Sequence, residues 1–220
     1  HLQVKFQAWR LNVGSTVMYL LDTELMQNDD YYRDLSSRVY GGDTAMRIGQ
    51  EIVMGVGGVR LLRALNIAPA VFHMNEGHSA FLTLELLREQ LSKGISLKHA
   101  EEWVREHCVF TTHTPVPAGH DRFSPDHMEY VWGKFRSDLG LEAKDFLGYG
   151  RVNPDDDQET FCMTVLALKM SRAANGVSEL HGEVSREMWR PLHLQNTTPV
   201  APIGHITNGI HVRGWMTRPT

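Results

Sequence analysis

The sequence predicts an α/β fold in which helices flank a parallel sheet. Two short apolar segments, 70–74 and 108–112, are typical of buried strands. Two amphipathic helical patterns lie between them, and this order of strand, helices and strand indicates a parallel βαβ unit. The composition of the 220 residues, 42% hydrophobic and 22% charged, is that of an ordinary globular protein with enough apolar side chains for a core.

The N-terminal part is expected to hold two strands and little helix. Residues 4–9 alternate between apolar and polar side chains, as a strand does. The continuous apolar run 16–21 favours a buried strand. Residues 27–40 are polar with some aromatic side chains, so we expect a loop or short helices there, followed by a turn at 41–43.

A long helix is predicted from Thr44 to about Leu65. Its apolar stripe, with steps of three and four residues, consists of Ile48, Ile52, Val56, Val59 and Leu62. Asp43 suits the N-cap, and Asn66 suits the stop. The glycines at 55, 57 and 58 each weaken a helix by about 1 kcal/mol relative to alanine, so we expect another backbone to approach closely at this point.

The βαβ unit itself follows. After the strand 70–74 and a loop at 75–78, one helix is expected to begin at Ser79 and to stop at Gly94. Ser96 is the expected cap of a second helix, which runs to the strand 108–112.

The remainder of the chain is predicted to be mainly helical. Ser124 followed by proline is a strong helix start. Residues 160–171 are mainly apolar and 178–189 amphipathic, so both are expected to be helices. We expect a proline-punctuated link at 191–202 and a turn-rich segment at 204–209.

Charge and composition exclude several classes of function. The formal net charge is −4 and no basic block occurs, so we expect no nucleic-acid partner and no membrane partner. No apolar run approaches the roughly 18 residues of a membrane span, and no signal-peptide pattern opens the chain. Cys108 and Cys162 lie in apolar runs and are expected to be buried free thiols of a cytoplasmic protein.

The two ends carry no cap and no tail. The chain begins at His1, enters an alternating segment at once, and stops at Thr220 shortly after Trp215. We expect that the sequence was cut from a longer one.

Polar loops follow the two strands of the βαβ unit. These loops are 75–78, with the sequence Asn-Glu-Gly-His, and 111–115, with the sequence Thr-Thr-His-Thr-Pro. Open parallel sheets bind ligands at the carboxyl ends of their strands, so the two loops are expected to share one crevice. Amide, carboxylate, imidazole and hydroxyl groups together suit a polar ligand such as a sugar.

Each of these side chains also has a purely structural interpretation. Glu76 could cap the following helix, and His78 could be a structural hydrogen-bonding group. His113, held just past a strand, is the better candidate for function. His73 lies on the strand and is expected to point into the core.

Two further patterns near these loops carry less weight. His120, Asp121 and Arg122 could form a local ion pair. The spacing of His73, Glu76 and His78 resembles a zinc hydrolase motif, but that motif needs two histidines four apart on one helix. We therefore expect no metal site.

At these loops the sequence resembles the α-glucan phosphorylases, the glycogen, starch and maltodextrin enzymes, and it is similar to their shorter microbial branch. No single matching stretch is specific, but together they are, and they span nearly the whole chain. The stretches are 20–23, 40–43 with Arg47, Gln50 and Glu51, 73–81, 111–123, 174–177 with His181, and 207–210 with Trp215.

The resemblance implies a glycosyltransferase of two Rossmann-like domains facing a cleft, the GT-B type. Residues 1–220 would form part of the N-terminal domain, without the C-terminal cofactor domain. The implied reaction transfers a terminal glucosyl unit of an α-1,4-glucan to phosphate and gives glucose 1-phosphate. The implied cofactor is pyridoxal phosphate, whose phosphate is the acid–base partner of the substrate phosphate. Its lysine has no match here, the piece alone is expected to be inactive, and the complete protein is expected to be a homo-oligomer.

The resemblance also implies roles for individual residues. His113 would contact the glucosyl unit near the reacting centre, and Trp215 would lie beside the cofactor. Residues 117–123 would form the mouth of the site. The positions implied to bind substrate are Asn75, Glu76, His78, Val177 and Asn208.

The sequence also departs from the family. The animal enzymes have a longer loop, with an asparagine that closes over the glucose, where this chain has only residues 41–43. Two alternatives stay open. The first is a nucleotide-sugar-dependent glucan synthase of the same architecture, and the second is a non-catalytic α-glucan-binding module.

Overall fold

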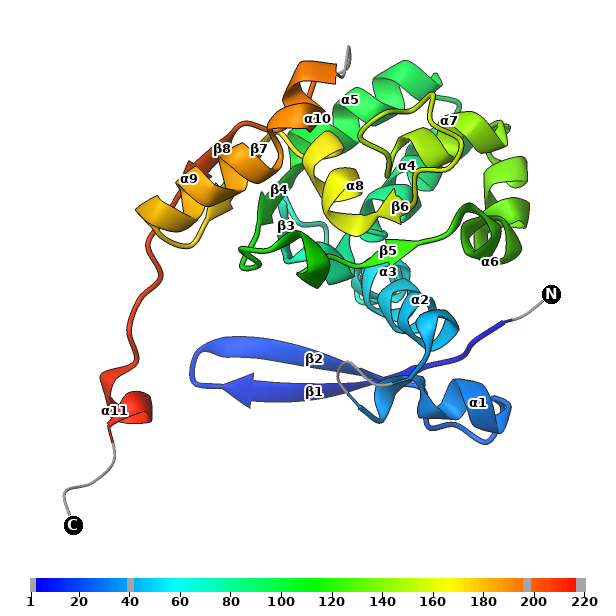
Figure 1. Cartoon of the computed structure of the whole chain (residues 1–220). Coiled ribbons are helices and arrows are strands. Elements are labelled where there is room, and N and C mark those ends of the chain that lie inside the picture. The colour runs from blue at the N-terminus through cyan, green and yellow to red at the C-terminus, as the bar shows by residue number, and fades with distance from the viewer. Residues whose placement is uncertain (1–2, 39–41, 196–198, 217–220) are drawn as a thin grey trace.

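A parallel sheet of four strands lies at the centre of the fold (Figure 1). This is a computed structural model, and it describes residues 3–38, 42–195 and 199–216. The sheet has the order β3-β4-β7-β8, and every neighbouring pair is parallel. Its strands are β3 (Phe72–Asn75), β4 (Cys108–Thr111), β7 (Ala173–Gly176) and β8 (Ile203–His205). All four carboxyl ends therefore lie along one edge, which we call the carboxyl edge.

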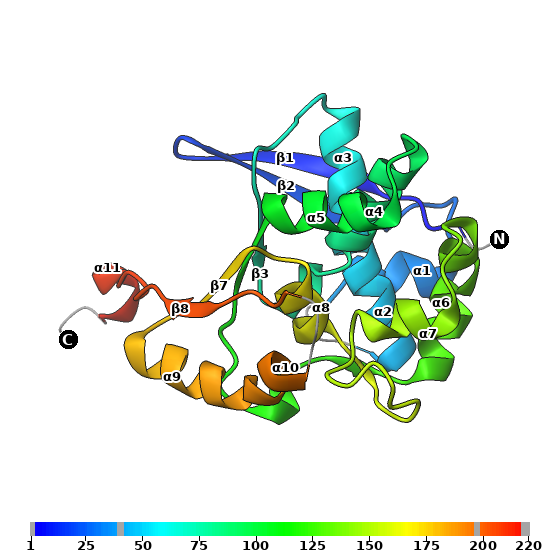
Figure 2. The same ribbon diagram turned by 90° about the horizontal axis from the view of Figure 1, so that it is seen from above.

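Strands β3 and β4 confirm the predicted βαβ unit. Helices α4 (Leu82–Ser92) and α5 (Leu97–His107) connect them, and Gly94 between these helices has a φ of 80° that favours glycine. Phe72, Met74 and Phe110 of the two strands are buried in the core. Figure 2 shows α4 and α5 on one side of the sheet and α9 and α10 on the other, so the architecture is that of a Rossmann-like domain.

The long helix before β3 is confirmed, with an irregular middle. It consists of α2 (Thr44–Ile52), a π-helical stretch η2 (Val53–Gly57) and α3 (Gly58–Ala64). The Asp43 side chain caps it by accepting from the Met46 amide at 2.9 Å, and Asn66, with a φ of 56°, follows its end. A Cβ on Gly55 would lie 2.6 Å from the backbone nitrogen of Leu82, which confirms the close approach of another backbone there.

The segment between β4 and β7 is mainly helical. It contains a 3₁₀ turn η4 (Pro117–Gly119), β5 (Arg122–Phe123), α6 (Pro125–Asp138), α7 (Ala143–Gly148), β6 (Phe161–Cys162) and α8 (Met163–Lys169). Ser124 caps α6 as predicted, because its hydroxyl accepts from the His127 amide. The helix expected over 160–171 was only partly correct, since its first residues pair as β6 with β5.

The C-terminal part differs from the prediction in two places. Helix α9 (Glu179–Met188) is confirmed, but the expected link at 191–202 contains most of α10 (Arg190–Gln195). The expected turns at 204–209 begin inside strand β8. This strand was missed because only Ile203 of its three residues is buried. A short helix α11 (Val212–Trp215) follows.

The N-terminal strands form an antiparallel hairpin, β1 (Gln7–Val13) with β2 (Thr16–Asp22). Both strands were predicted, the first of them at 4–9, but β2 is not buried: Val17 is 42% exposed and Met18 46% exposed. An apolar run favours a strand without saying what will cover it, and in Figure 1 the hairpin lies beside α2 and away from the sheet. The short helices α1 (Asp30–Arg33) and η1 (Asp34–Ser36) follow.

Two expectations about the chain as a whole can be compared with the structure. Cys108 and Cys162 are both buried and free, as predicted. Within the described ranges, no helix combines the length and the apolar character that crossing a membrane requires.

Candidate functional site

The loop after β3 has a strained backbone at Glu76. This residue has φ 67° and ψ 171°, a conformation that is almost confined to glycine and that costs about 1–3 kcal/mol for other residues. Its amide donates to the Thr111 carbonyl at 2.8 Å, which fixes the strained residue against the end of β4. Such strain gathers at functional sites, where the surrounding structure holds it in place.

The Glu76 carboxylate ties together the loops that follow β3 and β4. Its Oε2 accepts from the His113 amide at 2.9 Å and from the Thr114 hydroxyl at 2.6 Å. The side chain makes no capping hydrogen bond to the short helix η3 (Gly77–Ser79), so the interpretation of Glu76 as a helix cap was wrong. The carboxylate organises the neighbouring loop instead.

The His113 side chain completes this connection. Its Nε2 lies 2.6 Å from Oδ1 of Asn75, at the end of β3. Because an amide oxygen can only accept, Nε2 carries a proton and donates it. The imidazole is exposed, so packing does not orient it. The bond to Asn75 orients the ring, and the bond from the His113 amide to Glu76 fixes the backbone that carries it.

A cavity of about 370 Å³ lies at this part of the carboxyl edge. Its lining residues are Asn75, Glu76, His78, His113, Thr114 and Gly119. The structure thus brings together four of the predicted site residues around one space. Their amide, carboxylate and imidazole groups can donate to and accept from the hydroxyls of a small polar ligand.

The other predicted site residues lie further along the same edge. Val177 follows β7, and its amide donates to Nδ1 of His181 at 3.1 Å. The Asn208 amide donates to the Val177 carbonyl at 3.0 Å, but the Asn208 side chain is exposed and does not line the cavity. Trp215 belongs to α11, and its side chain lies outside the described part of the structure.

His78 of η3 belongs to a charged cluster with three other residues. Its Nδ1 lies 3.1 Å from Oδ2 of Asp121, and the same oxygen accepts from Nη2 of Arg47 at 2.8 Å. Arg47 also donates to Glu51 at 3.1 Å, one turn further along α2. The predicted local ion pair of residues 120–122 was therefore wrong, because the partners of Asp121 are distant in sequence.

The environment of this cluster shifts three pKa values. Burial raises the pKa of Glu51 to about 7. The hydrogen bond to Asp121, followed by that to Glu51, raises the pKa of His78 to about 9, so its imidazole is a cation at neutral pH. Although burial acts against it, the bond with His78 and the charge of Arg47 lower the pKa of Asp121 to about 2.

The cluster has the ligand types of a metal site but already contains a cation. One donor atom each from Glu51, His78 and Asp121 lies within 4.8 Å of the others. Nη2 of Arg47, however, lies 3.1, 3.4 and 2.8 Å from those three atoms in turn. The guanidinium occupies the position that an ion would take, so the geometry favours an internal ion cluster.

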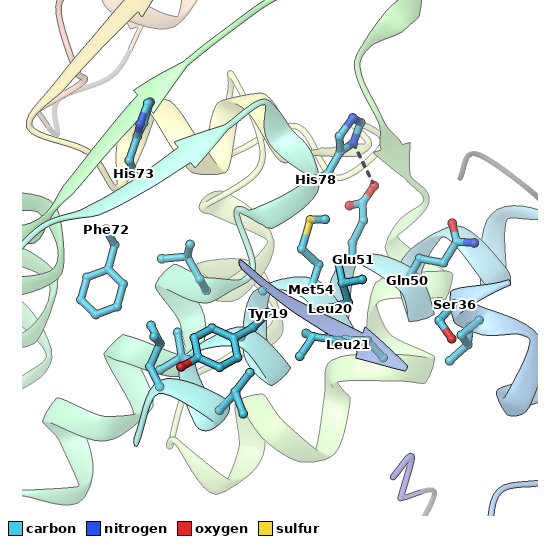
Figure 3. Close-up of a pocket in the computed structure, with 18 of the residues that line it drawn as sticks. Tyr19, Leu20, Leu21, Ser36, Gln50, Glu51, Met54, Phe72, His73 and His78 are labelled. Atoms are coloured by element: carbon cyan, nitrogen blue, oxygen red, sulfur yellow. Dashed lines mark ion pairs between the residues drawn. The ribbon is translucent and has the colours of Figure 1, made fainter. Parts of the chain in front are cut away.

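A larger cavity of about 900 Å³ lies between β2 and the helices α2 and α3 (Figure 3). Apolar side chains line most of it, among them Leu20, Met54 and Phe72. His78 lines both cavities, and Figure 3 shows it pointing toward Glu51 at the polar end of the larger one. The smaller cavity has the groups that recognise hydroxyls, and it is therefore the better candidate for chemistry.

The structure corrects one candidate and adds others. His73 is exposed and does not point into the core; its Nε2 lies 2.7 Å from the Thr111 hydroxyl. Thr114, Arg47 and Glu51 were not singled out as site residues. The last two carried a signal, because a charged pair one helical turn apart lies next to the apolar stripe of α2 and has to find buried partners.

The sequence matches known proteins along nearly all of its length, although no protein-family model matches it. It is 43% identical over 212 residues to a maltodextrin phosphorylase of Thermococcus litoralis, covering 96% of this chain and 24% of that protein. It is 42% identical over 224 residues to a glycogen phosphorylase of Mycobacterium tuberculosis, covering 96% and 26%. A glycogen phosphorylase of Aquifex aeolicus is 38% identical over 215 residues, with 97% and 30% covered. The chain thus spans between 24% and 30% of the length of these relatives.

Proposed function

We propose that the chain is part of an α-1,4-glucan phosphorylase, because it is 38–43% identical to maltodextrin and glycogen phosphorylases along nearly all of its own length. Such an enzyme is a glycosyltransferase that moves a terminal glucosyl unit from the glucan to phosphate and releases glucose 1-phosphate. We expect no activity from the 220 residues alone, because they correspond to 24–30% of the relatives' length.

The interlocked group of Asn75, Glu76 and His113 is the observation that supports this function. Three hydrogen bonds join these residues and Thr114, one of them from the main-chain amide of His113, and a strained backbone at Glu76 holds the group at the cavity. A pocket that fixes donors and acceptors before the ligand arrives favours selective recognition of sugar hydroxyls.

In the proposed reaction His113 contacts the glucosyl unit and is the catalytic residue of this chain. Asn75, Glu76 and His78 bind hydroxyls of the same unit. Fixed dipoles around the ring stabilise the oxocarbenium-like charge that develops when the glycosidic bond breaks. Val177 and Asn208 complete the substrate site from the neighbouring strands β7 and β8.

Pyridoxal phosphate is the cofactor that the family likeness suggests, and when bound it supplies an acid–base phosphate group. Lysine holds this cofactor covalently, yet no lysine lines either of the two cavities. Lys169 is buried elsewhere, and its Nζ donates to the carbonyls of Gly148 and Arg151. We therefore assign no residue of this chain to the aldehyde of the cofactor, and only Trp215 is proposed to lie beside its ring.

The proposal extends to the complete protein. Residues 1–220 would form part of the N-terminal domain of a GT-B enzyme, with the cofactor domain supplied by other residues. The buried free thiols of Cys108 and Cys162 favour a reducing compartment, so we place the protein in the cytoplasm. We also propose that the complete enzyme is a homo-oligomer.

A chimaera tests the function. In it, this chain replaces the matching 212-residue stretch of the Thermococcus litoralis maltodextrin phosphorylase. The chimaera is expected to release glucose 1-phosphate from maltodextrin in the presence of phosphate. A folded chimaera with pyridoxal absorbance but no phosphorolysis would contradict the proposal. Use of ADP- or UDP-glucose would indicate a glucan synthase, and amylose binding without turnover would indicate a binding module.

A further inference from the structure

We propose that Arg47, Glu51 and Asp121 are positioning residues that orient His78, so that its imidazole presents Nε2 to a sugar hydroxyl in the smaller cavity. The inference rests on the proposed function, which it extends from the residues that touch the ligand to those that act through His78. Of the four residues of this charged cluster, His78 alone lines the smaller cavity.

The cluster joins three segments that are far apart in the sequence. Arg47 and Glu51 lie on α2, His78 lies on η3, and Asp121 precedes β5. Arg47 and Asp121 are 74 residues apart, and a single Nη2 atom of Arg47 contacts both carboxylates. The loop before β5 and the loop after β3 are therefore fixed to the same helix.

Glu51 is the unusual member of the cluster because it is only 1% exposed. Its Oε1 accepts from Arg47, while its Oε2 is buried without a hydrogen-bond partner in the described structure. A buried carboxyl that is only partly satisfied is costly, and one that merely stabilised the fold could be replaced by an apolar side chain. Its position 3.9 Å from Nδ1 of His78 points to a role in placing that ring.

The two carboxylates lie on the same side of the His78 ring. Asp121 is 3.1 Å and Glu51 is 3.9 Å from Nδ1, so the proton on this nitrogen faces both of them. The opposite nitrogen, Nε2, is then the atom through which the ring would meet a ligand in the cavity. A protonated imidazole is a stronger hydrogen-bond donor than a neutral one, so it would hold a hydroxyl of the bound glucosyl unit more firmly.

The first test measures the ring itself in the 220-residue chain. Histidines are labelled with ¹⁵N, and the His78 signals are assigned from their loss in His78→Gln. His78 is expected to titrate at about 9, with Asp121→Asn lowering this pKa most and Glu51→Gln lowering it less. Glu85→Gln is the matched control, because Glu85 is fully buried and paired with two arginines but lines neither cavity. It should leave His78 unchanged.

The second test measures catalysis in the chimaera. Asp121→Asn is expected to lower kcat/KM for maltodextrin by roughly tenfold and to move the alkaline limb of the pH–rate profile to lower pH, because His78 then loses its proton earlier. Glu51→Gln should act in the same direction and less strongly. Glu85→Gln should lower the thermal midpoint without moving that limb.

The outcomes separate this inference from the proposed function. A folded chimaera that is inactive, or one unaffected by His113→Ala, would contradict the proposed function. The titration of His78 in the 220-residue chain would still test whether Asp121 and Glu51 hold its ring. A titration of His78 near its ordinary value of 6.5 would overturn the positioning role. An active chimaera in which Asp121→Asn leaves the alkaline limb in place would also overturn it.

Discussion

The two halves of the carboxyl edge are built in different ways. At the ends of β3 and β4, side chains bind one another: His113 donates to Asn75, and Glu76 accepts from the loop that carries His113. At the ends of β7 and β8, the Asn208 amide donates to the Val177 carbonyl, and the Asn208 side chain is exposed. The first half is fixed by hydrogen bonds between its own site side chains, whereas in the second half Asn208 is held by its backbone amide and not by its side chain.

This difference indicates how the proposed site divides its work. A group held before the ligand arrives loses little entropy on binding, so the β3–β4 half is suited to orient the reacting sugar. An exposed side chain without a hydrogen bond in the described structure can adapt to a ligand, which suits a secondary contact from Asn208. Changes in the first half should therefore affect both stability and turnover, and changes in the second half turnover only.

The largest effect is expected from His113→Ala. This change removes the proposed catalytic contact and leaves Oδ1 of Asn75 without its donor. We expect turnover of the chimaera to fall by at least about 100-fold, the usual range for a lost electrostatic or proton-transfer group. Steady-state phosphorolysis measures it. A loss of less than about threefold would show that the fixed half is not the reacting half.

The next effect concerns the strained residue, and it is a loss of stability. Glu76→Ala removes the acceptor of two hydrogen bonds but keeps a Cβ in a conformation that suits glycine, so unfolding should become easier by about 2–3 kcal/mol. Glu76→Gly loses the same bonds without the steric cost and should be about 1 kcal/mol more stable than Glu76→Ala. Urea unfolding of the two variants compares them. An alanine variant as stable as the glycine variant would argue against strain at this position.

The sequence was sufficient for the regular parts of the fold. The stripe of α2 and α3 repeats over many residues, and Asp43 and Gly94 carry the chemistry of a helix start and stop, so local rules located these elements. The sequence also predicted that Asn75 and His113 lie close together, because parallel strands in a βαβ unit place their carboxyl ends at the same edge of the sheet.

Long-range and conformational features could not be predicted in this way. The strain at Glu76 depends on the bond from its amide to Thr111, and no residue type signals it. The partnership of Arg47 with Asp121 joins residues 74 positions apart. The exposure of β2 depends on what packs against the hairpin, which an apolar run does not reveal.

The third expected effect is a dependence of stability on pH, because His78 belongs to the fixed half and carries a titratable ring. Its folded pKa of about 9 exceeds its ordinary 6.5, so its stabilising effect is complete below pH 6.5 and is lost as the pH rises through 9. Because the ring is partly exposed, we expect a loss of roughly 1–2 kcal/mol over this range. The measurement is the free energy of unfolding at several pH values.

His78→Gln is the control for this pH dependence. Lys169 acts in the opposite direction, because burial lowers its pKa to about 8 and its deprotonation favours the folded state at higher pH. The contribution of Glu51 to the free energy of unfolding changes mainly between pH 4.5 and 7. Subtracting the His78→Gln curve between pH 7 and 9 removes the contribution of Lys169. Parallel curves for the two proteins would show that His78 is not held by Asp121 and Glu51.

The smallest effect on stability is expected from Asn208→Ala. The Asn208 side chain is exposed, and the bond to the Val177 carbonyl comes from the backbone amide of Asn208, which alanine keeps. The free energy of unfolding of the chain should therefore change by less than about 0.5 kcal/mol. Turnover of the chimaera should nevertheless fall about tenfold if the amide binds a sugar hydroxyl there. Asn75→Ala is the matched change in the other half, and it should lower both quantities because it releases His113. Equal losses of stability for the two asparagine variants would mean that Asn208, like Asn75, holds its loop through its side chain, and the distinction between the halves would then fail.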